Sequence, residues 1–245
     1  MLQKTNGIVL RSVKYGETSL ICSVFTEVYG VQSYMIQGIR TSGKTKQSRA
    51  GLLQPASLLE LVVYHKPQAN LQRIKEFQPA YLYHSLQEHV VKNSVALFSV
   101  ELLLRLLPEH APMPELFEAC NQYFRALDMA DADAVGNYPI FFLVQCCNML
   151  GYNINGKYSE ETPHLNLRDG GFTNHTPTER PFVLDEDARM LDKLIQVETI
   201  EEATLVEMNG AVRFRLLDWL LAFIHNHTQH MGEMRSLPVL RAVLH

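Results

Sequence analysis

Residues 7–37 read GIVLRSVKYGETSLICSVFTEVYGVQSYMIQ, three short runs of alternating apolar and polar residues separated by turn residues. In the middle run, Leu20, Cys22 and Val24 share one face, which is the two-residue period of a strand with one buried side. Later runs repeat this pattern. The strands predicted in this way span residues 7–13, 19–27, 31–37, 57–65 and 71–77. Five strands within about 80 residues is the size of a small closed barrel.

Beyond the fifth strand the apolar period lengthens to that of amphipathic helices. Leu116, Cys120, Phe124 and Leu127, for example, recur at intervals of four, four and three residues. The period is lost again over about residues 152–181, where Asn, Gly, Thr and Pro gather. An irregular excursion is expected there, between helices on either side.

Together the two patterns predict an α+β fold with two domains. A five-stranded OB-fold barrel, a class that binds oligonucleotides, is expected over residues 1–80, and an all-helical domain over residues 81–245. A hydrophobic content of 47% is ample for such cores. The N-terminus lacks a secretory signal, and no apolar run reaches the roughly 20 residues of a membrane span. A cytoplasmic protein without membrane contact is therefore expected.

Cysteine and histidine do not form a metal site in the sequence. The four cysteines include no C-x-x-C pair and lie in apolar periodic segments, which predicts reduced thiols in the core. His225, His227 and His230 form an H-x-H-x-x-H pattern, but on a helix the first two lie about 200° apart. Neither a metal nor another cofactor is expected, and no catalytic constellation is found.

Charge is distributed unevenly along the chain. Residues 1–80 contain ten Lys and Arg against four Glu, a net charge of +6, whereas residues 81–245 have a net charge of −10. This asymmetry suggests that the first region meets a polyanion while the second handles packing or protein partners. The densest group of cations is the loop GIRTSGKTKQSR at residues 38–49, which we call the basic loop. Its cations are Arg40, Lys44, Lys46 and Arg49.

The basic loop favours nucleic-acid binding. Counterions released from phosphates are a general source of affinity, and OB barrels bind strands along one face and its bordering loops. Elsewhere in the barrel region, the candidate phosphate contacts are Arg11, Lys14, Lys66 and Arg73. Tyrosines in or beside strands are candidates for stacking on bases: Tyr34 above all, with Tyr15, Tyr29 and Tyr64.

Two alternatives of other classes stay open. The chain is a protein-interaction scaffold if its basic loop binds an acidic tail instead of DNA. It is a nucleotide hydrolase if the match to G-x-x-x-x-G-K-T within the loop is a phosphate-binding site. That site needs a helix directly after the loop, and Gly51 and Pro55 disfavour one.

The motifs with the most specific pattern are GIVL at 7–10, YGETS at 15–19, SRAGLLQP at 48–55, LLEL at 58–61, LGY at 150–152 and RSLPVL at 235–240. They resemble the bacterial RecO recombination mediator family, the first four its N-terminal domain and the last two its helical domain. The resemblance implies a nucleoid-associated DNA-repair protein that is not an enzyme. Such a protein binds single- and double-stranded DNA, anneals strands, binds RecR and the C-terminal tail of single-stranded DNA-binding protein, and helps to load RecA.

Two further expectations follow from the resemblance. An acidic tail that ends in apolar residues needs a cation beside an apolar surface, and Arg105 and Arg125 flank apolar helix positions. Many members also carry four zinc-binding cysteines in the helical domain. The matching stretch here, residues 163–177, contains none, so zinc binding is not implied for this chain.

Overall fold

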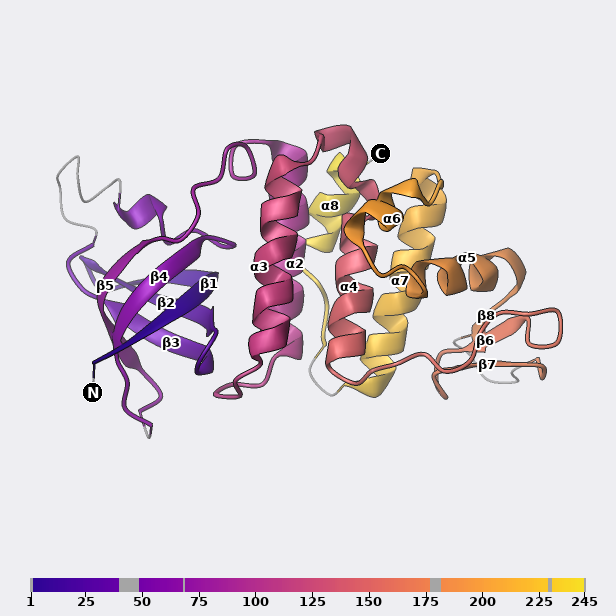
Figure 1. The fold of residues 1–245 in the computed structure, drawn as a ribbon, viewed down its shortest axis with the longest axis horizontal. Coiled ribbons are helices and arrows are strands. Elements are labelled where there is room, and N and C mark those ends of the chain that lie inside the picture. The colour runs from indigo at the N-terminus through magenta and orange to yellow at the C-terminus, as the bar shows by residue number, and fades with distance from the viewer. Residues whose placement is uncertain (1, 40–48, 68, 177–181, 229–230, 245) are drawn as a thin grey trace. The chain divides into compact units, whose positions relative to one another are not determined.

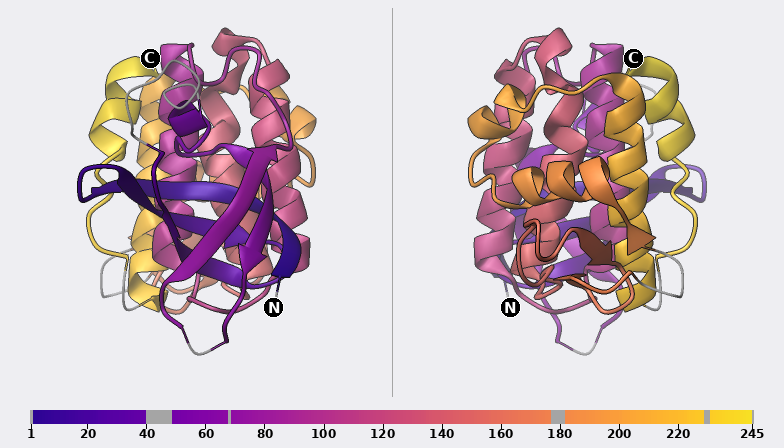
Figure 2. Two further views of the ribbon diagram at one scale, coloured as in Figure 1. Left: turned by 90° about the vertical axis from the view of Figure 1, so that its left-hand side faces the viewer. Right: turned by 90° about the vertical axis from the view of Figure 1, so that its right-hand side faces the viewer.

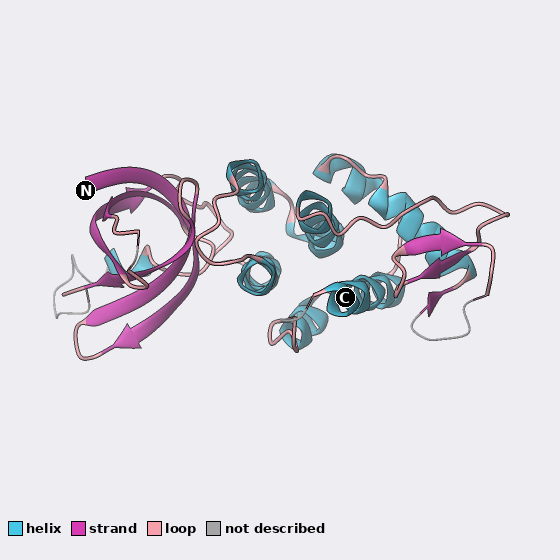
Figure 3. Ribbon diagram, turned by 90° about the horizontal axis from the view of Figure 1, so that it is seen from below, coloured by secondary structure: helices cyan, strands magenta, loops and turns pink. Residues whose placement is uncertain are grey.

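The computed structural model describes residues 2–39, 49–67, 69–176, 182–228 and 231–244 (Figure 1). Its first region is a closed five-stranded barrel in the order β1-β2-β3-β5-β4. The strands are β1 (Leu2–Tyr15), β2 (Ser19–Thr26), β3 (Gly30–Ile36), β4 (Leu58–Tyr64) and β5 (Gln72–Pro79). Neighbours pair antiparallel, except that β3 and β5 are parallel. The predicted OB-like barrel is thus confirmed, and Figure 3 shows its strands curving around one interior.

The barrel closes around side chains that alternate along each strand. Leu20, Cys22 and Val24 of β2 point into the core, as their spacing predicts. Strand β1 is longer than predicted because its first half pairs with β4 and its second half pairs with β2. A β-bulge between Val9 and Arg11 follows the stretch that pairs with β4, and such bulges bend a strand and turn its side chains.

The remainder of the chain is mainly helical, which confirms the mixed α+β class. The helices are α2 (Val90–Leu106), α3 (Pro114–Met129), η1 (Ala132–Asn137), α4 (Tyr138–Met149), α5 (Asp185–Ile195), α6 (Ile200–Leu205), α7 (Gly210–His227) and α8 (Leu237–Val243). Helix α4 is apolar on nearly all sides because it packs against α5, α6 and α7. Within the described residues, we find no helix long and apolar enough to span a membrane.

A small sheet corrects two expectations, that residues 152–181 are irregular and that the domain over residues 81–245 is all-helical. It consists of β6 (His164–Asn166), β7 (Gly171–Thr173) and β8 (Phe182–Val183), in the order β7-β6-β8. Strand β6 contacts α5, and Figure 2 shows the two together. Runs of three residues or fewer are too short to give a readable period, although Leu165 and Leu167 are fully buried.

Contacts divide the chain into two compact units. The first contains residues 1–88 and 100–129, and the second contains residues 89–99 and 130–245. The first unit therefore includes α3 as well as the barrel, and the ring of Phe117 on α3 meets the ring of Phe25 on β2 edge to face. The domain boundary at residue 80 stays a prediction. It is placed where the predicted strand pattern ends, whereas the two units are defined by contacts.

Candidate nucleic-acid interface

The second half of β1 and strands β2 and β3 present a continuous outer surface. Residues paired across neighbouring strands point to the same side of a sheet. The register pairs Val13 with Ile21 and Ile21 with Met35, so these apolar side chains form one row. The same register places Arg11, Ser23 and Ser33 in a second row beside the first. We call the whole surface the β1–β3 face, and it consists of Arg11, Val13, Tyr15, Ile21, Ser23, Ser33 and Met35.

The row continues onto the other two strands with a cation and an aromatic residue. Met35 pairs with Arg73 of β5, and Arg73 pairs with Tyr64 of β4. Lys66 follows in the β4–β5 loop, where the Gln72 amide accepts from its N–H at 3.0 Å and donates to its carbonyl at 2.7 Å. The side chain of Gln72 thus holds the start of this loop. Basic residues therefore border the β1–β3 face on the side of β4 and β5.

Four predicted phosphate contacts lie on or beside this face. Arg11 is on it, Lys14 is next to Tyr15 at the end of β1, and Lys66 and Arg73 lie on the β4–β5 side. All four side chains are exposed. The sequence predicts each of these cations as a phosphate contact, but it does not predict how they lie relative to one another. The structure adds the apolar row between them, which was not predicted from the sequence although Ile21 alternates with the core positions Leu20 and Cys22 of β2.

Exposure decides which tyrosines are available to stack on bases. Tyr15 is 54% exposed and Tyr64 is 43% exposed. Tyr34 is 0% exposed, because it stands one residue before the outward Met35 and therefore points into the barrel. Burial raises the pKa of its phenol, and its prediction as a stacking residue is wrong. Tyr29 is half-buried and its ring stacks on His65.

The basic loop is described only at its ends. Arg40, Lys44 and Lys46 lie outside the described residues, as does the G-K-T part of the nucleotide-binding pattern. Before it, strand β3 ends at Ile36, which pairs with Leu20 close to the β1–β2 turn. The chain therefore leaves the barrel for the loop near the end of the β1–β3 face.

At the end of the basic loop, the described chain resumes with a single helical turn at residues 49–51. Arg49 is exposed, and its guanidinium carbon lies 4.9 Å from the centre of the Phe77 ring. Leu53 then buries its side chain in the barrel core. The basic loop is thus anchored to the barrel through both of its neighbouring segments.

The two predicted partner-binding arginines have different surroundings in the first unit. The guanidinium of Arg105 pairs with the Glu101 carboxylate at 2.7 Å, one helical turn earlier. Arg125 lies over the ring of Tyr81 and lines a hollow of about 200 Å³ beside Phe117 and Asn121. Arg125 therefore has the apolar neighbour that the prediction requires, whereas the charge of Arg105 is balanced within its helix. Both assignments stay predictions.

The described residues include no group of three or more His, Cys, Asp or Glu placed to hold a metal ion. His227 instead donates from Nε2 to the Leu167 carbonyl at 3.0 Å and packs on Phe223. His230 lies outside the described residues. All four cysteines are free and buried, as their apolar segments predict.

Comparison with known proteins accounts for nearly all of the chain. The family model of the recombination protein O N-terminal domain matches residues 1–83, and that of the recombination protein O C-terminal domain matches residues 87–237. The chain belongs to the recombination protein O (RecO) family. This confirms the resemblance found in the sequence motifs, and it places the chain among proteins of DNA repair and recombination.

Relatives that match over nearly the whole of both chains are each named DNA repair protein RecO. The DNA repair protein RecO of Phocaeicola vulgatus is 30% identical over 241 residues, which is 98% of each chain. That of Bacteroides fragilis strain YCH46 is 29% identical over 242 residues, again 98% of each. That of Christiangramia forsetii is 26% identical over 243 residues, 99% of each. The similarity to RecO therefore extends through both compact units.

Proposed function

We propose that this RecO-family chain is a non-enzymatic recombination mediator that holds single-stranded DNA on its β1–β3 face. The observation that carries the proposal is the register. It places exposed Tyr15 and Tyr64 at the two ends of one surface, sets Arg11 beside the apolar row and puts Arg73 between Met35 and Tyr64. Aromatic rings accept stacked bases, and separate cations release counterions from phosphates without reading sequence.

The basic loop extends this surface in our proposal. Arg40, Lys44, Lys46 and Arg49 contact phosphates as independent charges, on double-stranded as well as single-stranded DNA. Bound cations lower the repulsion between two strands, so the same contacts promote annealing. Their support is the charge of the loop and its attachment near the end of the β1–β3 face.

Protein partners are assigned to the rest of the chain. We propose that it binds RecR and the acidic tail of single-stranded DNA-binding protein, and through them helps to load RecA at the nucleoid. The net charge of −10 over residues 81–245 makes this region a poor surface for DNA. Arg125, with its apolar neighbours, and Arg105 are the candidates for the tail.

A salt titration tests the DNA site. Binding of the full chain to two unrelated labelled oligonucleotides is measured for wild type, Arg11→Ala and Arg73→Ala, with Lys157→Ala as a charge-matched control in the second unit. Each face variant should reduce the slope of log K against log[salt] by about 0.7, equally for both sequences. Lys157→Ala should leave the slope unchanged. Wild-type slopes in both face variants, with unchanged thermal melts, would remove DNA from the β1–β3 face.

A further inference from the structure

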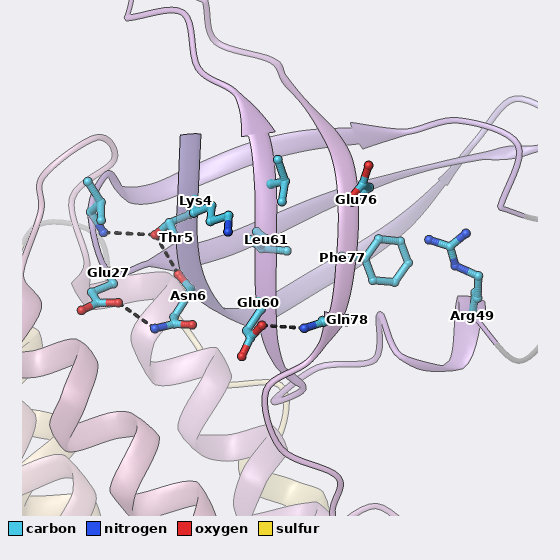
Figure 4. Close-up of a pocket in the computed structure, with 12 residues that line it drawn as sticks. Lys4, Thr5, Asn6, Glu27, Arg49, Glu60, Leu61, Glu76, Phe77 and Gln78 are labelled. Carbon is cyan, nitrogen blue, oxygen red and sulfur yellow. Dashed lines mark hydrogen bonds between the residues drawn. The ribbon is translucent and has the colours of Figure 1, made fainter. Parts of the chain in front are cut away.

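The barrel carries a second surface, on the outer side of β1, β4 and β5. A hollow of about 630 Å³ lies there, and Figure 4 shows the side chains that line it. Register places Lys4, Val62 and Glu76 in one outward row of this surface. The next row along the same strands is Asn6, Glu60 and Gln78. We call this hollow the β4 groove.

The β4 groove contains most of the acidic side chains of a basic region. Residues 1–80 have four acids, and three of them, Glu27, Glu60 and Glu76, line this one hollow. Of the ten Lys and Arg in the same region, the described lining includes two, Lys4 and Arg49. The described lining therefore has a net negative charge, although residues 1–80 as a whole have a net charge of +6.

Two of these carboxylates are held in place without being neutralised. Asn6 donates from Nδ2 to Glu27 at 2.9 Å, and Gln78 donates from Nε2 to Glu60 at 2.6 Å (Figure 4). Neutral amide donors fix the positions of the carboxylates and leave their charge for a ligand. Glu76 differs, because its carboxylate pairs with the ammonium of Lys75 at 3.2 Å.

Apolar side chains complete the β4 groove. Val28 is 46% exposed at its rim, and Val62 is half-buried in the row of Glu76, next to the row that contains Glu60. Arg49 covers the ring of Phe77, so its guanidinium is held at the edge of the hollow. An apolar patch beside fixed negative charges is a surface for a side chain on a cationic segment, and it is larger than a single ion needs.

We infer that the β4 groove docks an extended segment of a partner protein in which Lys or Arg residues flank an apolar residue. The apolar side chain packs on Val62, and the cations of the segment meet Glu60 in the neighbouring row and Glu27 beside it. The barrel formed by the described strands is closed, so recognition runs through side chains and not through addition of a strand to a free edge. This inference does not depend on the β1–β3 face as the DNA site.

Methyl spectra of the full chain test where such a segment binds. The probe is the acetylated and amidated peptide Lys-Leu-Lys-Leu-Lys, and Glu-Leu-Glu-Leu-Glu is its control. We expect the lysine peptide to shift the methyl signals of Val28, Leu61 and Val62, and the glutamate peptide to shift none of them. Spermidine is titrated in parallel, because a site that selects charge alone would bind it with the same affinity and overturn the inference.

Variants test which charges recognise the peptide. Glu27→Gln and Glu60→Gln should each weaken its binding about twofold to fivefold, the range of exposed charge pairs. Glu17→Gln removes the fourth acid of this region, which lies in the β1–β2 turn, and should change nothing. Val62→Lys places a cation on the apolar patch and should weaken binding by about tenfold or more. Thermal melts verify folding, and the two glutamine variants decide the matter if Val62→Lys does not fold.

Three results would overturn the assignment. One is a loss with Glu17→Gln as large as that with Glu27→Gln or Glu60→Gln, because binding would then follow net charge. Another is a set of shifted methyls outside the β4 groove. The third is a shift of the methyl signals of Val28, Leu61 and Val62 by single-stranded oligonucleotide in the absence of peptide, which would put the groove on the path of the DNA. A failure of the DNA proposal leaves the methyl shifts and the glutamine variants unaffected, so the two ideas fail separately.

Discussion

The β1–β3 face and the β4 groove share one barrel and one strand, yet they differ in charge. The second half of β1 contributes Arg11 to the face, and the first half contributes Lys4 and Asn6 to the groove. None of the seven residues that define the face is acidic, whereas three glutamates line the groove. The comparison shows that the net charge of a small barrel does not predict the charge on any one side of it.

Bulges mark both borders between the two surfaces. On β1 the register shifts between Val9 and Arg11, and in the β4–β5 pair it shifts between Val62 and Val63. A bulge adds one residue to a strand and changes which side the following side chains take. Arg73 and Glu76 lie on the two sides of the second shift and belong to different surfaces. The extra residue lets both Arg73 and Glu76 point outward, although they are an odd number of positions apart, and places them in neighbouring rows.

The largest effect is expected from a residue on which both surfaces depend. Asp128 of α3 is 2% exposed, and its carboxylate accepts from the backbone N–H groups of residues 84–86 at 2.8–2.9 Å. Asp128→Ala leaves these donors without their acceptor and should lower the free energy of unfolding by about 3 kcal/mol or more. Urea unfolding measures this loss. DNA and peptide binding should then decline together near the unfolding transition, unlike in every variant below.

The pH dependence of Asp128 has a defined sign. Burial opposes its ionisation, but the backbone donors outweigh burial and hold the pKa of the carboxyl below its ordinary value. Its contribution is therefore present above the unfolded pKa of about 3.9 and is lost as pH falls through the folded value. The difference between wild type and Asp128→Ala should shrink only below about pH 4. A difference that fades between pH 8 and 5, or an equal loss in the exposed control Asp131→Ala, would contradict this role.

Removal of one exposed ring should separate the two surfaces. Tyr15→Ala should weaken single-strand binding by about 1–3 kcal/mol, the usual contribution of one stacked base, and leave the lysine peptide unaffected. Val28→Ala in the β4 groove is the apolar control and should leave DNA affinity unchanged. Fluorescence anisotropy with a labelled oligonucleotide measures both. Equal losses in the two variants would mean that the surfaces are not distinct in function.

An added carboxylate should have a smaller effect that depends on its surface. Ser23→Glu places a negative charge in the middle of the β1–β3 face and should weaken single-strand binding by about 1 kcal/mol at low salt. Gln78→Glu adds the same charge in the β4 groove and should change DNA affinity by less than half of that. Binding is compared at two salt concentrations, since the difference should diminish as salt rises. A larger loss from Gln78→Glu would reverse the assignment of the surfaces.

The smallest effect is expected inside the barrel. The hydroxyl of Tyr34 is buried without a hydrogen-bond partner among the described residues, so Tyr34→Phe should leave stability unchanged or raise it by up to about 1 kcal/mol. DNA affinity should stay at the wild-type value, in contrast to Tyr15→Ala. Thermal melts and anisotropy provide the two measurements. Weaker DNA binding by a fully folded Tyr34→Phe would return this residue to the interface.

Much of the fold could be predicted because its patterns are local. The alternation of Leu20, Cys22 and Val24 indicates a strand whatever that strand pairs with. The length of β1 could not be predicted, because its first half is a strand by virtue of pairing with β4, about 55 residues later in the chain. Leu165 and Leu167 illustrate the same limit, since runs of three residues form a sheet only through the neighbours they meet.

The candidate site divides in the same way. That Arg11, Lys66 and Arg73 belong to a basic region follows from counting, and the family follows from motifs that need no coordinates. That Tyr34 faces the core while Tyr15 faces solvent depends on the phase of each strand, and strand phase depends on bulges and pairing partners.

The amino-acid sequence alone determined the five strands, the helices, the basic region and the family, because each is written in short-range periodicity or in contiguous motifs. Tertiary structure alone decided that cations and acids of one region occupy different surfaces of one barrel. The physical reason is that the charge of a residue is fixed by its type, whereas its neighbours on the barrel surface are fixed by the pairing register of the strands. Strands distant in the chain must pair before any side chain has a neighbour across the sheet.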